Sequence, residues 1–182
     1  MNHKFLNKRY EFFFTKSRNL TNLEKHAENF VHSAYEILSK NKDGLLDQAS
    51  DINQFINHDE FIHCSMIAAF RLVENDLYDK YGFDHPTTIK LMELLMNEFS
   101  KHDPGFNDLI QYIVIFMQDS IQNNNFGSEF DSFQKVLGFW ILYTLKEGEL
   151  YFDNAGNIEI AAIVGNWISN LFDDYWENIP EY

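Results

Sequence analysis

The sequence has few of the residues that build disulfide-bonded or turn-rich proteins. Its single cysteine among 182 residues, Cys64, allows no disulfide within the chain, which fits a reducing compartment. Eight glycines and three prolines are too few for the many tight turns of a β-sandwich. These shortages favour a protein built from long helices.

Long apolar runs are also missing. The longest run, residues 112–117, is far shorter than the roughly 20 residues that a membrane-spanning helix needs. The first 25 residues are charged throughout, and their longest apolar run, residues 12–14, is too short for the apolar region of a secretion signal. We therefore expect a cytoplasmic protein without a targeting segment or a membrane partner.

Basic residues are scarce over most of the chain, and none follows Lys146. The net charge is −14, made up of +4 over residues 1–25 and −18 over residues 26–182. A surface of this charge repels phosphate backbones, so we expect no nucleic-acid binding. The negative electrostatic field of the same surface speeds the encounter with a basic protein, which is the partner that the composition favours.

Apolar and aromatic residues are plentiful. Hydrophobic residues make up 45% of the chain and aromatic residues 16%, enough for a substantial core in one compact domain. We predict a mainly α, single-domain bundle of about six or seven helices with one short β-hairpin near the C-terminus. Residues 1–19 would form a basic arm or short strand, residues 20–146 the bundle, and residues 147–182 an acidic hairpin plus a final helix. The basic arm could dock on the acidic remainder of the fold or on a second copy of the chain, and the latter would give a homodimer.

Helix boundaries are marked by polar and proline residues. Thr21 and Glu24 form a capping box, in which each side chain binds the backbone N–H of the other residue. Gly82 marks the end of a later helix. The other predicted helices are 45–57, 59–81 capped by Asp59, two that begin at Pro86 and Pro104, and one that Ser128 caps and that runs to about residue 146.

Residues 149–160 predict the hairpin. Apolar residues alternate in two short segments on either side of a turn at residues 153–157, namely Leu150 and Phe152, then Ile158 and Ile160. A lone hairpin is marginally stable in water, so it must pack on helices or extend a partner's sheet. A final amphipathic helix is predicted over about 161–178.

Most signatures of catalysis and cofactor binding are absent. The chain lacks the H-E-x-x-H and paired-cysteine zinc motifs, Gly-rich phosphate loops and the G-x-S-x-G motif. Residues 41–44 and 153–156 faintly resemble calcium loops, but Ser50 and Ala162 stand where the bidentate Glu is required. We therefore expect no cofactor, and we interpret Cys64 as a packed thiol.

One segment nevertheless looks catalytic. Glu60 and His63 have the E-x-x-H spacing by which di-iron helical bundles hold a metal. Such a site needs a second copy of the motif, and the chain has none, because Glu98 and His102 are four residues apart.

Two HD pairs occur, at His58-Asp59 and His102-Asp103. They are similar to the HD pair of all-helical metal-dependent phosphohydrolases, whose first histidine would here be His26 or His32. Both aspartates are also explained as helix N-caps. The alternative function is therefore a helical metal-dependent hydrolase, with its metal site at His58, Asp59, Glu60 and His63.

The function that we predict is binding rather than catalysis. Acidic residues surround aromatic rings near the C-terminus, and aromatic side chains rimmed by acids are good anchors for a basic partner. We predict a non-catalytic acidic protein that recognises and neutralises a basic partner protein, as immunity proteins and inhibitors that mimic nucleic acid do. The predicted partner-binding residues are Glu149, Glu159, Asp173, Asp174, Trp176 and Glu177.

Overall fold

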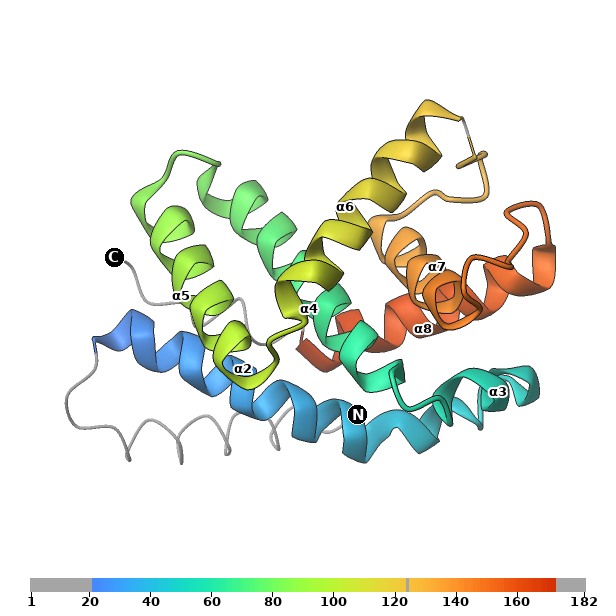
Figure 1. Cartoon of the computed structure of the whole chain (residues 1–182), viewed down its shortest axis with the longest axis horizontal. Helices are drawn as coiled ribbons and strands as arrows, with labels where there is room; N and C mark the ends of the chain where they lie inside the picture. The colour runs from blue at the N-terminus through green and yellow to red at the C-terminus, as the bar shows by residue number, and fades with distance from the viewer. Residues whose placement is uncertain (1–20, 124, 173–182) are drawn as a thin grey trace.

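Figure 1 shows the computed structural model of the protein, which describes residues 21–123 and 125–172. Over these residues the chain forms seven α-helices and two 3-10 helices, with no strand. The predicted mainly α class is therefore confirmed. None of the helices described is long and apolar enough to cross a membrane. The predicted basic arm or strand at residues 1–19 lies outside the described residues.

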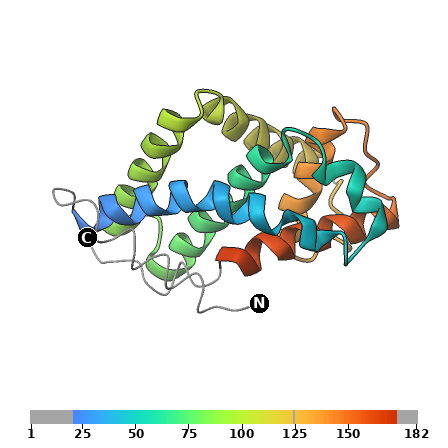
Figure 2. The ribbon, with the colours of Figure 1, turned by 90° about the horizontal axis from the view of Figure 1, so that it is seen from below.

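The α-helices follow one another with short connections. In chain order they are α2 (Asn22–Asn41), α3 (Asn53–Ile56), α4 (Phe61–Tyr81), α5 (Pro86–His102), α6 (Phe106–Gln122), α7 (Phe133–Leu145) and α8 (Ala155–Phe172). The 3-10 helices η1 (Lys42–Leu45) and η2 (Ser50–Ile52) lie between α2 and α3. Seen from below, α2 and α8 lie side by side across one face (Figure 2).

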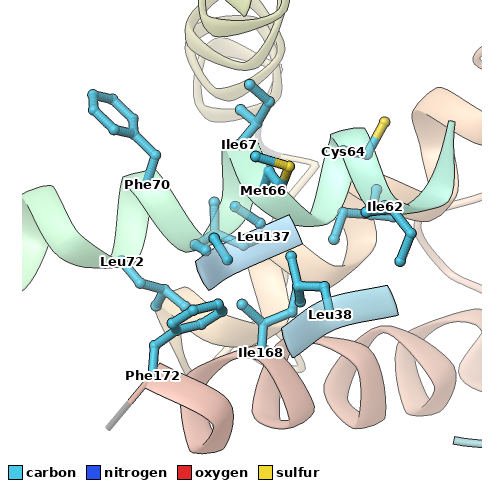
Figure 3. Close-up of a cluster of buried hydrophobic side chains, with 14 of the residues drawn as sticks. Leu38, Ile62, Cys64, Met66, Ile67, Phe70, Leu72, Leu137, Ile168 and Phe172 are labelled. Carbon is cyan, nitrogen blue, oxygen red and sulfur yellow. The ribbon is translucent and has the colours of Figure 1, made fainter. Parts of the chain in front are cut away.

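Helix α4 runs through the middle of the molecule, and every other described α-helix packs against it (Figure 1). A helix that is apolar on nearly all sides is a buried helix, and residues 61–70 of α4 have that pattern, with His63 as the one exposed residue. In Figure 3, Ile67 and Phe70 leave α4 on one side, whereas Leu72 points to the other side, toward Phe172 of α8. Helix α4 is therefore the element on which the rest of the bundle is assembled.

Cys64 belongs to this core. It is buried on α4, and burial, with the nearby charge of Glu60, raises the pKa of its thiol to about 12. A thiol with so high a pKa is not a thiolate nucleophile at neutral pH. The interpretation of Cys64 as a packed thiol is confirmed.

Two of the predicted helix starts are confirmed. At Thr21 both halves of the capping box form, with the Thr21 N–H donating to Glu24 over 2.7 Å and the Glu24 N–H donating to Thr21 over 3.2 Å. Pro86 is the first residue of α5, and Nδ1 of His85 accepts the N–H of Thr87. Gly82 ends α4 with a φ of 88°, which a residue with a Cβ rarely adopts.

The start predicted at Asp59 is wrong. Helix α4 begins two residues later, after a turn in which Nδ1 of His58 accepts the N–H of Glu60. The start predicted at Pro104 is also two residues early, because the Asp103 carboxylate accepts the N–H of Gly105 and closes a turn before α6. In both places a side chain stabilises a turn instead of capping a helix.

The start predicted at Ser128 is wrong as well. Helix α7 is capped four residues later by Ser132, whose hydroxyl accepts the N–H of Lys135 over 3.3 Å. The residues before it stay non-helical and pack the rings of Phe126 and Phe130 against other aromatic side chains. The predicted helix over residues 45–57 is likewise broken into η1, η2 and α3.

The predicted hairpin is not observed. Residues 149–152 have no regular structure, and Ile158 and Ile160 lie in the first turns of α8. The reason is that Asn154 caps a helix instead of shaping a hairpin turn. Its side-chain oxygen accepts the N–H of Asn157 over 3.2 Å, and its carbonyl accepts the N–H of Ile158. The final helix thus begins about six residues earlier than predicted, and the predicted part beyond Phe172 lies outside the described residues.

Candidate functional site

Helix α6 exposes large apolar side chains to solvent. Ile113 and Phe116 are buried against the bundle, but Tyr112 is 65% exposed and Ile115 is 52% exposed. In Figure 1, α6 rises away from α4 toward one end of the molecule. Adjacent exposed apolar residues of this kind mark interaction surfaces.

Tyr112 and Ile115 form one wall of a groove with a volume of about 520 Å³. We call it the α6–α7 groove, because α6 provides one side and α7 with the loop after it provides the other. Its lining includes Tyr112, Ile115, Phe116 and Asp119 from α6, Tyr143 from α7, and Glu147 and Phe152 from the loop. Its aromatic and apolar walls are interrupted by the polar residues Ser120, Asn123, Asn125 and Thr144.

Phe152 is the residue that holds this region together. Its ring centre lies 4.8 Å from that of Phe139 and 6.0 Å from those of Phe116 and Tyr143. Ring pairs at these separations stabilise a cluster beyond the burial of their area. Because the loop before α8 is anchored here, the groove is fixed by packing on both sides.

A second hollow of about 550 Å³ adjoins the groove, and the two share Asn125 and Phe152. Its charged lining residues are three acids, Glu129, Asp153 and Glu159, and one base, Lys135. The aromatic groove therefore continues into an acidic hollow on the other side of Phe152.

The charge around both hollows is mostly negative, although Lys135 also lines the second hollow. Residues 102–172 contain nine acidic residues and two basic ones, Lys135 and Lys146. The Lys135 amine is bound by Asp131 at 2.6 Å and by the Glu129 carbonyl at 2.7 Å. The Lys146 amine lies between Gln54, at 2.9 Å, and the ring of Phe55.

Within the described part of the chain, the carboxylates of the groove have no cationic partner. Among the residues that the structure describes, no Lys or Arg forms an ion pair with Asp119, Glu147 or Glu159. Glu147 also has a left-handed backbone, with a φ of 51°, directly after α7. Apolar walls with unpaired acids at their edges can accept a ligand that is both apolar and positively charged.

The predicted partner-binding residues lie partly in this region. Glu159 lines the second hollow, and both Glu159 and Glu149 are exposed. The predicted residues that lie outside the described part of the chain are Asp173, Asp174, Trp176 and Glu177.

The sequence analysis missed the aromatic part of the groove. Ile113 and Phe116 form the inner, buried face of α6, whereas Tyr112 and Ile115 are not among the residues predicted from the sequence. These two residues belong to the longest apolar run of the chain but lie off that inner face. An apolar run that continues round a helix beyond its buried face is the signal that indicates an exposed patch.

The residues of the alternative metal site do not come together. His58, Asp59, Glu60 and His63 are all exposed. Within the described residues, the one group of three side chains placed to share a metal ion is His32, Glu98 and His102. His63 lines the same cavity as His32 and His102.

Comparison of the chain with protein-family models, curated proteins and solved structures found no match. Function is therefore inferred from the shape and charge of the sites themselves. The α6–α7 groove is the site whose shape and charge agree with the acidic character of the whole chain.

Proposed function

We propose that the protein is a non-catalytic binding protein that captures a basic amphipathic segment of a partner protein in the α6–α7 groove. The observation that carries the proposal is the combination of exposed aromatic walls with carboxylates that pair with no Lys or Arg among residues 21–123 and 125–172. The proposed binding surface lies on α6, α7 and the loop before α8, and it adds Tyr112, Ile115, Asp119 and Glu147 to the residues expected from the sequence.

The apolar walls supply the affinity. Tyr and other large aromatic residues are frequent among the few interface residues that carry most of the binding energy. An amphipathic helix places apolar residues at i, i+3, i+4 and i+7 into such a groove. Tyr112, Ile115 and Phe152 are the side chains that would contact these anchors.

The carboxylates supply the selection for a basic partner. Asp119 and Glu147 lie at the groove and Glu129, Asp153 and Glu159 at the adjoining hollow. Lysine or arginine residues along the polar edge of the bound segment would pair with them. Charges of this kind mainly raise the association rate and are screened by salt.

The role that follows from such binding is neutralisation. A basic segment of a nuclease or another nucleic-acid-binding protein normally contacts phosphates, and an acidic protein that covers it competes with those phosphates. Immunity proteins and inhibitors that mimic nucleic acid act in this way.

A labelled peptide of about 18 residues, five helical turns long, tests the groove directly. The peptide contains leucine and lysine, with the leucines on one helical face, and the control peptide has the same composition in scrambled order. Fluorescence anisotropy should show tighter binding of the amphipathic peptide, lost by about 0.5 M NaCl, where charges are screened within a few Å.

Matched charge reversals distinguish peptide binding by the groove from general attraction by the net negative charge of the protein. Asp119→Lys with Glu147→Lys should weaken peptide binding at least about tenfold, a change of about 1.4 kcal/mol. The control, Asp47→Lys with Glu60→Lys, changes the net charge equally at exposed residues outside the groove. Equal effects of both pairs, or equal binding of the scrambled peptide, would contradict a groove-specific site.

A further inference from the structure

Two helices bring two histidines and a glutamate together at a place that the groove does not use. Glu98 and His102 are four residues apart on α5, so they share one face of that helix. Helix α2 packs along α5 and adds His32 to the same face. The E-x-x-x-H spacing is visible in the sequence, but only the packing of α2 on α5 supplies the third group.

The distances between these groups are close to those of a metal site. Nε2 of His102 lies 3.4 Å and Nε2 of His32 lies 4.0 Å from Oε1 of Glu98. The three ligand atoms all lie within 4.8 Å of one another. Metal–ligand bonds of about 2.1 Å in a tetrahedral site place ligand atoms about 3.4 Å apart. The His102–Glu98 pair already has this separation, and a small rotation of the His32 ring would bring its Nε2 to the same distance from Glu98.

The glutamate is held in position by a second contact. Nζ of Lys101 donates to Oε2 of Glu98 over 2.5 Å, which leaves Oε1 directed toward the two histidines. Carboxylates that bind metals are commonly oriented by a hydrogen bond of this kind to the other oxygen. Glu98 is only 14% exposed, whereas His32 and His102 are 45% and 46% exposed, so an ion can reach the group from solvent.

A cavity of about 310 Å³ adjoins the cluster, and His32 and His102 form part of its lining. Tyr35 and His63 line it from α2 and α4, and Phe99 and Phe106 complete an aromatic wall. Three protein ligands leave at least one coordination position of a tetrahedral ion for water or a small molecule. That open position would face a cavity large enough for a small ligand.

We propose that His32, Glu98 and His102 bind a divalent transition-metal ion, zinc above all, with its open position facing this cavity. Two imidazoles and one carboxylate suit zinc and related ions, whereas magnesium and calcium prefer oxygen ligands. This proposed metal site replaces the one expected from the sequence at His58, Asp59, Glu60 and His63. The cavity beside the site shares no lining residue with the α6–α7 groove, so failure of one proposal would not contradict the other.

Zinc binding to the full chain tests the site. The protein is prepared without a histidine tag, stripped with a chelator and titrated with zinc chloride in a calorimeter. One zinc ion per chain is expected, and an excess of magnesium should not displace it. Bound zinc should also raise the melting temperature, because it binds the folded state.

Substitutions distinguish this site from other histidines. His32→Ala with His102→Ala should weaken zinc binding about 100-fold or more, since loss of mere supporting contacts already costs 10–100-fold. His58→Ala, an exposed histidine outside the cluster, should leave zinc binding unchanged. Because both substituted ligands are about half exposed, the double variant is expected to fold, which circular dichroism verifies. Zinc binding that survives the double substitution in a folded protein, or no stoichiometric zinc in the unsubstituted chain, would overturn the proposal.

Discussion

At the scale of single residues, His26 shows how burial controls ionisation. Its side chain is fully buried on α2, and the loss of solvation lowers its pKa to about 3. In the unfolded chain the same imidazole titrates near its ordinary value of about 6.5. Between these two pKa values the unfolded state binds a proton that the folded state does not bind. The free energy of unfolding must therefore fall as the pH is lowered through this window.

This linkage predicts the effect of removing the imidazole. His26→Gln keeps a polar side chain but cannot titrate. Urea unfolding at about pH 7 and about pH 5 should show that the natural chain loses about 2 kcal/mol more stability on acidification than the variant does. Comparing the two losses cancels any constant cost of the substitution. If both proteins lose the same stability, His26 is not buried as a neutral imidazole.

Exposed residues show the opposite limit. Tyr112 and Ile115 contribute little to the stability of the isolated molecule, because more than half of the surface of each side chain contacts solvent. We expect these two side chains to contribute binding energy in the complex with a basic partner. Substituting them should therefore affect partner binding more than stability, unlike the substitution of buried core residues.

At the scale of elements, two glycines determine how closely α7 and α8 pack. A Cβ on Gly138 would overlap the backbone of Ala161, and a Cβ on Gly165 would overlap the backbone carbonyl of Gln134. The contacts are reciprocal, so each helix lies directly against the backbone of the other. Such a close approach is a reason for glycine inside a helix despite its low helix propensity.

Gly165→Ala is therefore predicted to destabilise the protein. Alanine favours a helix by about 1 kcal/mol over glycine, but the added Cβ forces α7 and α8 apart, and overpacking typically costs about 1–3 kcal/mol or more. We expect a net loss of about 2 kcal/mol in urea unfolding. Gly44→Ala, at an exposed position where an added Cβ would meet nothing within 4 Å, is the control and should not lower stability. A Gly165→Ala variant as stable as the control would contradict this packing.

At the scale of the whole molecule, like charges repel one another. The net charge of −14 is large for a chain of 182 residues, and the cations of residues 102–172 are too few to balance it. Added salt screens this repulsion, because the Debye length falls from about 30 Å at 0.01 M to about 8 Å at 0.15 M. The melting temperature should therefore rise by a few degrees between these two salt concentrations.

Sodium and potassium chloride should act equally in this experiment, since screening depends on ionic strength and not on a specific ion. The same salt increase should weaken the binding of a basic peptide in the groove. Salt is thus expected to stabilise the free protein and to destabilise its complex. A melting temperature that falls with salt would show that attractive ion pairs outweigh the repulsion.

The sequence by itself determined the helical class, the capping box at Thr21, the proline start of α5 and the glycine end of α4. Each of these depends on contacts within a few residues, or on the backbone angles that one residue permits, and such contacts are visible in the sequence. It also determined the acidic charge, which needs no structure.

Only the tertiary structure decided the remaining features. The rings of Phe126 and Phe130 keep residues before α7 out of a helix, although Ser128 is a good local cap. The packing of α2 on α5 brings His32 to Glu98 across 66 residues of sequence, and the separation of α6 from α7 opens the groove. These arrangements depend on which faces of distant helices meet, and local propensity contains no information about that choice.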